Sequence, residues 1–310
     1  MRIDLHVHSN ASDGTDAPAE VIRRAAEAGL DVVALTDHDT TAGWPEAQKA
    51  LPAGLSLLPG MELSCEIKQD GKNRSVHLLT YGFDPTDEDL LGETTLIRGD
   101  RSARAMMMVG KINQLGGTDV TWELVMRIAD GAVVGRPHIA RAMVEAGVIA
   151  EPADAFTEEW IADGGRAYVE RYSVTAERAI RIVRAAGGVP VLAHPRSPGY
   201  EVSDESIERL AEGGLAGLEV FHPDHDAAER TRLTDLAGRL SLVMTGGSDD
   251  HGSFNNSGIG SQTTPVDEYQ KLVAQIGNAE AELCGSFTCM GYYSDGQKSF
   301  GSAPLRVRRG

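Results

Sequence analysis

Cysteine is scarce in this sequence: only Cys65, Cys284 and Cys289 occur among its 310 residues. An odd and low number of cysteines excludes a disulfide framework and is typical of a protein from a reducing compartment. Four residues separate Cys284 from Cys289, and no second pair accompanies them. These two residues are either ordinary thiols or a metal-binding pair, and the spacing favours ordinary thiols.

Long hydrophobic runs are also missing. The longest apolar segments, such as VPVLA at residues 189–193, are far too short to span a bilayer. The chain begins MRIDLHVHS, where no positively charged region leads into an apolar stretch, so we expect no signal peptide. These absences predict a cytoplasmic protein that has no membrane partner.

Positive charge is the third deficit. The sequence has 29 lysines and arginines against 46 aspartates and glutamates, which gives a formal net charge of -17. So acidic a protein repels phosphate backbones, which argues against binding of duplex DNA. If the substrate is an anion, its positive partner must be local: metal ions or a few well-placed arginines.

An alternation of strand and helix patterns is what the sequence does contain, and 41% of its residues are hydrophobic. Seven short apolar runs predict strands at residues 3–8, 31–36, 55–58, 76–81, 189–193, 218–221 and 242–245. Helical spacing of apolar residues predicts helices at residues 18–28, 176–186, 206–211 and 227–240. This order predicts an α/β fold with a mostly parallel sheet, either open or closed into a barrel.

Residues 86–172 differ from the rest because they show helical patterns, at 90–115, 121–129 and 138–146, and no convincing strand. We therefore expect two parts. Residues 1–85 and 173–310 form the α/β unit, and residues 86–172 form an inserted helical subdomain.

Histidines and carboxylates gather at the ends of the predicted strands. They are His6 and His8 at the first strand, Asp37, His38 and Asp39 after the second, Glu62 after the third, His77 in the fourth, His194 at the fifth, and Asp249 and His251 after the seventh. In a parallel sheet or barrel, the carboxyl ends of the strands are where active sites are built. Six of the nine histidines would thus converge on one place.

The pattern His6-x-His8 is suited to binding a metal ion. Side chains alternate across a strand, so residues two apart share a face and can bind one ion. Asp249 and His251 have the same spacing, and Asp13 can return from the loop after the first strand. Taken singly, a buried histidine is more often a hydrogen-bonded core residue, and Asp37-His38-Asp39 could be a capping turn. Taken together, imidazoles and carboxylates without a thiolate indicate Mn²⁺, Zn²⁺ or Fe²⁺.

These residues resemble the motifs of the PHP (polymerase and histidinol phosphatase) family of metal-dependent phosphoesterases. The resemblance implies a distorted seven-stranded β/α barrel, similar to that of the amidohydrolases, with two or three divalent transition metal ions, most often manganese. It implies three ligand groups: His6, His8, Glu62 and Asp249 for one ion, Glu62, His77 and His194 for a second, and Asp13, His38 and His251 for a third.

Within this family the chain is similar to the branch of 3',5'-nucleoside bisphosphate phosphatases and 5'→3' exonucleases on short RNA. The helical insert and its Gly135-Arg136-Pro137-His138 motif carry this likeness. It implies a hydrolase that removes a phosphate from a small nucleotide, most plausibly the 3'-phosphate of a 3',5'-nucleoside bisphosphate, by attack of a hydroxide bridging two metal ions. Inorganic phosphate is then the product.

Several further residues are candidates for substrate binding. The resemblance assigns phosphate to Arg136 and His138, although the motif could also simply start a helix with Pro137 in its first turn. Arg101 and Arg104 lie three residues apart on one helix face and either meet a second phosphate or face solvent. Arg196 is a further candidate for binding phosphate. It directly follows Pro195, whereas the branch is expected to have a glycine or alanine between the proline and the arginine.

Other residues are candidates for donating a proton to the leaving group or for orienting the metal ligands. His222 could protonate the leaving oxygen, and His225 is expected in a surface loop. Asp37 and Asp39 could orient His38 or another ligand. Trp122, Trp160, Tyr168 and Tyr172 are either core residues of the insert or, in one case, a stacking partner for a base.

Alternative functions stay open at this point. The same pocket could serve a 5'→3' exonuclease on short RNA, or a phosphatase of another small phosphate such as histidinol phosphate. A non-catalytic PHP module that binds nucleotides is the alternative from a different class, and the complete ligand set argues against it.

Overall fold

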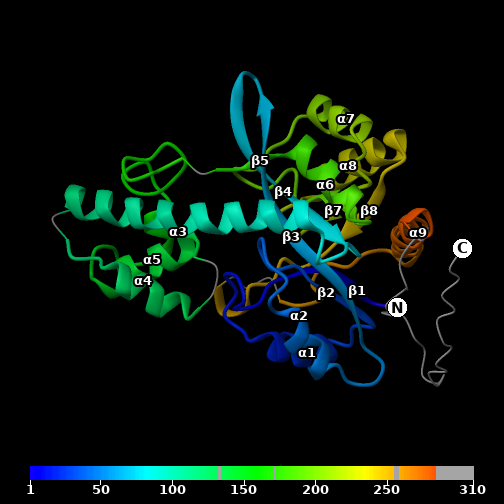
Figure 1. The fold of residues 1–310 in the computed structure, drawn as a ribbon, viewed down its shortest axis with the longest axis horizontal. Coiled ribbons are helices and arrows are strands. Elements are labelled where there is room, and N and C mark those ends of the chain that lie inside the picture. Colours follow the sequence, from blue (N-terminus) through cyan, green and yellow to red (C-terminus); the bar gives the residue numbers. More distant parts are fainter. Residues whose placement is uncertain (117, 132–133, 171, 255–257, 284–310) are drawn as a thin grey trace, which may run out of the picture.

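The structure is a computed structural model of the chain, and it describes all residues except 117, 132–133, 171, 255–257 and 284–310 (Figure 1). Within the described residues, one sheet has the strand order β1-β2-β3-β4-β6-β7-β8, and β5 pairs with β3. The strands are β1 (Ile3–Val7), β2 (Val32–Leu35), β3 (Ser56–Gln69), β4 (Lys72–Tyr81), β5 (Val174–Thr175), β6 (Val189–Leu192), β7 (Gly217–Phe221) and β8 (Val243–Gly246).

The helices of the described chain carry local start signals. They are α1 (Pro18–Glu27), α2 (Trp44–Ala50), α3 (Glu88–Gly116), α4 (Trp122–Ala129), α5 (Arg136–Glu145), α6 (Ala176–Ala185), α7 (Asp204–Glu212), α8 (Ala227–Leu240) and α9 (Val266–Leu283). Side chains of Thr175, Ser203 and Asp226 accept the backbone N–H three residues on and so begin α6, α7 and α8. None of the described helices is both long and apolar enough to cross a membrane.

The sheet closes on itself between its first and last strands. The backbone N–H of His8 donates to the carbonyl of Asp250 (2.9 Å), and the N–H of Asp249 donates to the carbonyl of His6 (2.8 Å). These two bonds join the end of β1 to the segment after β8, as parallel strands do. The expected distorted seven-stranded β/α barrel is confirmed, and its seam lies beside three of the predicted metal ligands.

One hairpin makes the sheet mixed rather than parallel throughout. β3 runs beside β2 from Ser56 to Pro59, leaves it, and continues to Gln69 antiparallel to β4. Asp70 and Gly71 join β3 to β4 with φ values of 52° and 74°, as a two-residue type I′ turn requires. β4 is also antiparallel to β6. The third strand is therefore longer than the predicted 55–58, and Glu62 lies within it rather than after it.

The interior of the barrel is apolar at the end opposite to the predicted ligands. Ile3, Val32, Val189 and Val243, at the starts of their strands, form one buried cluster with Leu272 of α9. α9 thus covers the amino-terminal end of the barrel, and the carboxylate of Glu268 on α9 accepts the backbone N–H of Met244 in β8 (2.9 Å). The carboxyl ends of the parallel strands are left for the site.

The helical segment between β4 and β5 has its own core. α3 packs Leu90 and Ile97 against the barrel and its later residues, such as Met108 and Ile112, against α4 and α5. Figure 1 shows α3 extending well beyond the barrel, with α4 and α5 beneath its far half. The three helices predicted in this segment are present, and its described residues hold no strand between α3 and β5. The exact division into 1–85 with 173–310 and 86–172 stays a prediction.

Candidate metal centre and substrate cleft

His6 in β1 and His8, directly after the end of β1, are both fully buried, and their Nε2 atoms lie 3.1 Å apart. Glu62 Oε2 lies 3.3 Å from His6 Nε2 and 3.1 Å from His8 Nε2. Asp249 Oδ1 lies 3.2 Å and 3.3 Å from the same two nitrogens. Donor atoms that share one tetrahedral ion at 2.0–2.2 Å lie about 3.3–3.6 Å apart, so these four donors have the spacing of a metal site.

Glu62 is the centre of the wider cluster. Its Oε2 also lies 3.2 Å from His38 Nδ1, and its Oε1 lies 2.8 Å from His77 Nδ1 and 3.0 Å from His194 Nε2. The carboxylate is 1% exposed. A carboxylate with different histidines on its two oxygens can bridge two ions, which is the role that the resemblance implied for Glu62.

A third group forms around Asp13. Its carboxylate lies 3.3 Å from His251 Nε2, 3.7 Å from His38 Nε2 and 3.8 Å from His8 Nδ1. His8 and His38 therefore each lie close enough to belong to two of the three ligand groups. The prediction from the sequence assigned each of them to one group only. The structure brings all nine predicted ligands together, while the assignment of each residue to an ion stays a proposal.

The donor chemistry fits divalent metal ions. His8 Nδ1, His38 Nδ1 and His194 Nδ1 are buried without a hydrogen-bond partner, although buried polar atoms are normally paired. His38 Nδ1 faces Glu62 Oε2 at 3.2 Å without the geometry of a hydrogen bond. Neutral imidazoles and carboxylates gathered around shared points are the donors that Mn²⁺, Fe²⁺ and Zn²⁺ accept.

The electrostatics of the cluster point the same way. Burial disfavours the charged ring of His8, but Asp249 and Glu62 outweigh burial and raise the pKa of His8 to about 10. Burial lowers the pKa of His38 to about 3, against the attraction of Glu62 and Asp13. Burial also opposes ionisation of Glu62, yet its histidine neighbours hold the pKa of this carboxyl well below its usual range. The ionised carboxylates thus favour positive charge next to them, which either protons on the histidines or bound metal ions can supply.

Asp37 and Asp39 do not contact the ring of His38 in any hydrogen bond of the described chain. Asp37 accepts hydrogen bonds from the backbone N–H of Ser9 (2.8 Å) and from the hydroxyl groups of Ser9 and Ser12 (both 2.7 Å). These bonds hold the loop that carries Asp13. Asp39 accepts from the backbone N–H and hydroxyl of Ser64 at 2.7 and 2.8 Å. Both carboxylates therefore hold neighbouring segments in place.

Sequence reasoning missed two buried carboxylates beneath the cluster. Glu219 on β7 is fully buried and meets His6 and His194. Asp4 on β1 accepts the backbone N–H of Ser248 (3.0 Å) and of Gly260 (2.8 Å), and burial raises the pKa of Asp4 to about 6. An ionisable residue in an otherwise apolar strand, as in LEVF at residues 218–221, was the available signal.

His222 and His225 have different surroundings. His222 lies with its Nε2 3.4 Å from Asp249 Oδ2 and its Nδ1 3.4 Å from the hydroxyl of Ser197, so it borders the metal-ligand cluster. His225 is 2% exposed, which corrects the expectation of a surface residue. Its Nδ1 donates to the carbonyl of Val220 (2.9 Å), and its Nε2 accepts the N–H of Arg196 (3.3 Å), because the loop folds back over β7.

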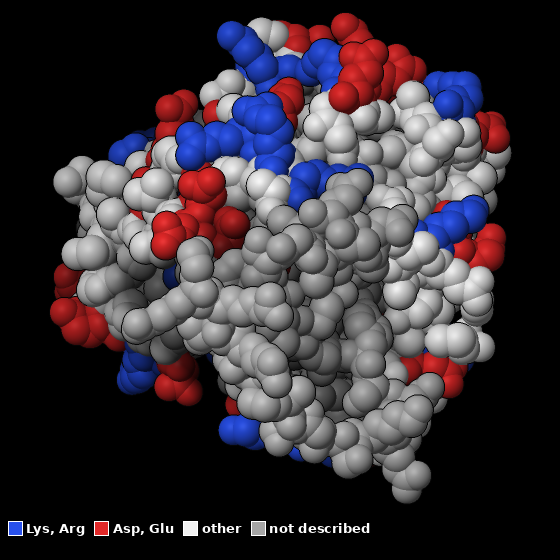
Figure 2. Space-filling model, turned by 45° about the vertical axis from the view of Figure 1, so that its right-hand side comes forward, with Lys and Arg blue, Asp and Glu red and all other residues white. Residues whose placement is uncertain are grey.

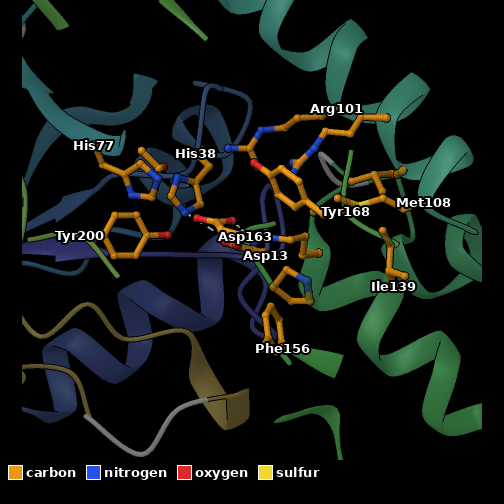
Figure 3. Close-up of a pocket in the computed structure, with 17 residues that line it drawn as sticks. Asp13, His38, His77, Arg101, Met108, Ile139, Phe156, Asp163, Tyr168 and Tyr200 are labelled. Carbon is orange, nitrogen blue, oxygen red and sulfur yellow. Dashed lines mark hydrogen bonds and ion pairs between the residues drawn. The ribbon is translucent and has the colours of Figure 1, made fainter. Parts of the chain in front are cut away.

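One cleft joins the cluster to the helical segment, and it encloses about 800 Å³ including its open mouth. Its lining includes Asp13, His38 and His77 from the barrel and Arg101, Arg104 and Arg136 from α3 and α5. Figure 3 shows His38 and His77 on one side of this cleft, Met108 and Ile139 on the other, and Arg101 between them. The cleft therefore places cations opposite the candidate metal centre.

The three arginines of the cleft are held by the protein in different ways. Arg101 Nη2 lies 2.8 Å from Asp39 Oδ2, and its buried Nε has no hydrogen-bond partner. Arg104 donates from Nε to the carbonyl of Val169 (2.5 Å) and lies 5.0 Å above the ring of Tyr168. Arg136 pairs with Asp163 Oδ1 at 2.6 Å. Each guanidinium is thus held at the cleft by contacts with the protein.

Arg196 is directed elsewhere. It forms ion pairs with Asp204 and, at 3.4 Å, with Glu229, and it is not among the residues that line the cleft. Binding of phosphate by Arg196 stays a prediction, and in this structure its guanidinium is engaged by these two carboxylates instead. Arg196 directly follows Pro195, and from there its side chain reaches Asp204 of α7 and Glu229 of α8.

His138 starts a helix, as the alternative reading of its motif proposed. Its Nδ1 accepts the backbone N–H of Gly135 (3.0 Å) at the beginning of α5, with Pro137 in the first turn. Burial lowers the pKa of His138. A neutral ring that accepts at Nδ1 carries its proton on Nε2, so the capping role leaves one donor available.

Of the four aromatic residues that the sequence singled out, one lines the cleft. Tyr168 lines it, whereas Trp122 and Trp160 pack on the core of the helical segment. Tyr172 donates to Glu93 and borders a neighbouring hollow. Tyr200, which the sequence did not single out, lines the cleft with its ring 4.9 Å from that of His77.

The surface has no comparable concentration of positive charge on the face that Figure 2 shows. There, Lys and Arg side chains of the described residues are interspersed with Asp and Glu. This mixture agrees with the net charge of -17. The cleft arginines and the ligand cluster are the features described above that suit a small anion.

Comparison with known proteins identifies related sequences. The model of the PHP domain matches residues 4–113. The 5'-3' exoribonuclease Rnm of Salmonella typhimurium is 34% identical over 80% of this chain and 84% of its own length. The 3',5'-nucleoside bisphosphate phosphatase of Chromobacterium violaceum is 34% identical over 80% and 87%. The phosphoribosyl 1,2-cyclic phosphate 1,2-diphosphodiesterase of Eggerthella lenta is 34% identical over 81% and 94%.

Solved structures show the same fold. A protein from Bifidobacterium adolescentis described as a metal-dependent phosphoesterase superposes with a TM-score of 0.80 at 36% identity, covering 88% of this chain and 96% of the other. An amidohydrolase from Chromobacterium violaceum, determined with bound sulfate and no metal, gives a TM-score of 0.77 at 30% identity, covering 89% and 97%. The two solved structures share the architecture of this chain, and the three sequence relatives carry names with different substrates.

Proposed function

Because this chain belongs to the PHP domain family and is a metal-dependent phosphoesterase, we propose that it removes the 3'-phosphate of a 3',5'-nucleoside bisphosphate. The relatives alone do not select this substrate, since three of them are equally similar and are named for three different reactions. The choice depends on the cleft.

The observation that carries the proposal is the presence of two anion-attracting regions in one small cleft. The ligand cluster contributes Asp13, His38 and His77 to its lining, and the helical segment contributes Arg101, Arg104 and Arg136. A substrate with two phosphates can place one phosphate at each region, whereas a mononucleotide uses only one. Arg136 presents a planar set of donors that suits a phosphate.

The chain's own residues divide the work as follows. The three groups centred on Glu62, Asp13 and the His6–His8 pair would hold the divalent ions. When bound, such ions activate water and neutralise charge on the phosphoryl oxygens. Arg101 and Arg136 orient the substrate, and His138 donates from Nε2 to a phosphate oxygen. His222, beside Asp249 but outside the ligand set, is the proposed proton donor to the leaving oxygen.

A substrate panel tests the proposal. With Mn²⁺ present, we expect kcat/KM for phosphate release from 3'-phosphoadenosine 5'-phosphate to exceed that for AMP by about 10-fold or more, because one charged contact contributes about 1.5–3 kcal/mol. Histidinol phosphate, a phosphoribosyl 1,2-cyclic phosphate and a 5'-phosphorylated RNA trinucleotide complete the panel. A higher kcat/KM for any of these would overturn the choice of substrate, and cleavage of none would contradict the assignment as a phosphoesterase.

A 5'→3' exonuclease acting on short RNA is the second candidate, and one observation favours it. A second hollow continues from the cleft, since both are lined by Ser75, Asp163 and Tyr168, and it includes Lys72 and Arg74 of β4. This hollow offers room for nucleotides beyond the first. The trinucleotide in the panel distinguishes this candidate from the first.

Arg136 and Arg196 form a matched pair for a mutational test. We expect Arg136→Ala to lower kcat/KM for the bisphosphate by about 10- to 100-fold, because a charged donor to phosphate is lost. Arg136→Lys should recover only part of this loss, since lysine lacks the two-pronged geometry. Arg196→Ala removes the same group outside the cleft, so steady-state kinetics should show no change. Equal losses in both alanine variants would contradict this placement of the phosphate.

A further inference from the structure

Glu219 occupies an unusual place for an ionisable residue. It lies in the middle of β7 within LEVF, and it is 0% exposed. Burying a carboxylate costs several kcal/mol unless hydrogen bonds compensate for the lost water. The hydrogen bonds that it makes therefore indicate what it does.

Each oxygen of Glu219 meets a different predicted metal ligand. Oε1 lies 3.0 Å from His6 Nδ1, and Oε2 accepts the backbone N–H of His194 (2.8 Å). His6 belongs to β1, and His194 follows the end of β6. In the closed barrel, β7 and β8 lie between these two strands. One buried side chain thus connects two separate parts of the ligand cluster.

The bond to His6 determines which nitrogen of its ring carries the proton. A carboxylate only accepts, so Nδ1 must donate, and when the ring is neutral, as a metal ligand must be, Nε2 is left with its lone pair. That Nε2 lies 3.3 Å from Glu62 Oε2 and 3.2 Å from Asp249 Oδ1. The lone pair is therefore directed at the point where these carboxylates would share an ion.

The bond to His194 holds a strained backbone. His194 has a φ of 25°, in the region that residues with a side chain rarely adopt and that costs roughly 1–3 kcal/mol. Its Nε2 lies 3.0 Å from Glu62 Oε1. Fixing the N–H of His194 on Glu219 keeps this turn in the conformation that directs the ring at Glu62.

We propose that Glu219 is a positioning residue of the metal centre, which fixes the Nδ1–H form of His6 and the backbone of His194 at the same time. This inference concerns metal binding and does not depend on which phosphate ester is the substrate. Failure of the substrate panel would leave it untouched.

Glu219→Gln is the sharpest test because it keeps size and removes one acceptor. If its NH₂ group faces His6, the ring must accept at Nδ1 and its proton moves to Nε2, where it blocks a cation. If the NH₂ group faces the N–H of His194, two donors oppose each other. We expect zinc affinity, measured by competition with a chromophoric chelator, to fall about 10- to 100-fold, as for other outer partners of metal ligands. Glu219→Asp, which keeps both acceptor oxygens, should lose less.

Glu268→Gln is the matched control. Glu268 is also a buried glutamate that accepts a backbone N–H of a strand, that of Met244, but it does so from α9 at the other end of the barrel. Its zinc affinity should equal that of the unmodified protein. An equal loss in Glu268→Gln would show that the effect reflects general weakening of the barrel and would overturn the proposal.

A measurement on the unmodified protein decides the matter if Glu219→Gln does not fold. Long-range ¹H–¹⁵N correlation of the zinc-loaded protein reports which nitrogen of each histidine carries the proton. We expect His6 to be protonated on Nδ1. Protonation on Nε2, or an unchanged zinc affinity in folded Glu219→Gln, would overturn the proposal.

Discussion

Replacing Asp249 with alanine should abolish turnover while the chain stays folded. Asp249 Oδ1 lies 3.2 Å from His6 Nε2 and 3.3 Å from His8 Nε2, so its loss removes one of four donors from the tightest group. We expect kcat to fall by more than the roughly 100-fold that follows loss of an outer partner of a metal ligand. Steady-state phosphate release and metal analysis of the same sample provide the measurement.

The conformation of Asp249 calls for a second variant. Its φ is 50°, a left-handed conformation that costs alanine about 1–2 kcal/mol. Asp249→Asn tolerates this conformation better, keeps the shape and removes only the charge. Both variants should bind less metal and retain the circular dichroism spectrum of the parent. Full activity in either would exclude Asp249 from the site.

Removing the metal ions should have the second large effect. Dialysis against a chelator is expected to reduce phosphate release to background, and Mn²⁺, Zn²⁺ or Fe²⁺ should restore it better than Mg²⁺, because the site offers imidazole nitrogens. Metal content measured before and after reconstitution is the control. Undiminished turnover in protein shown to hold far less than one ion per chain would contradict the metal centre.

The metal-free protein should also lose stability as the pH rises. The pKa of His8 in the folded chain is raised to about 10, above its usual value of 6.5, by Asp249 and Glu62. The pKa values of His6, His194 and His251 are raised as well. A raised pKa in the folded state contributes stability that is complete below pH 6.5 and is lost as the pH rises toward 10.

Thermal unfolding between pH 6.5 and 9 tests this expectation. His38 has a lowered pKa of about 3 and is neutral in both states above pH 6.5, so it does not oppose the trend. In the metal-loaded protein, ions replace the protons, and their binding strengthens as protons become scarce. The difference in Tm between loaded and metal-free protein should therefore widen with pH. A constant difference would show that the ions do not compete with protons at these histidines.

Much of the barrel followed from local patterns. The runs at residues 31–36, 189–193 and 242–245 are apolar because strands covered on both faces must be, and the structure has β2, β6 and β8 there. The hairpin was different. Leu63, Cys65 and Ile67 continue the third strand, but only its pairing with β4 separates that continuation from a loop. The Asp70-Gly71 turn was the sequence signal for it.

The sequence by itself determined the chemistry of this protein. His6, His8, Asp13 and Asp249 are donors whose type and spacing are local properties, readable without a fold. The tertiary structure alone decided how these donors combine: that Glu62 meets five histidines, that Glu219 joins β1 to β6, and that Arg196 pairs with α7 and α8 rather than with the cleft. The physical reason is that such contacts link residues far apart in the chain, and only the closure of the barrel brings them within bonding distance.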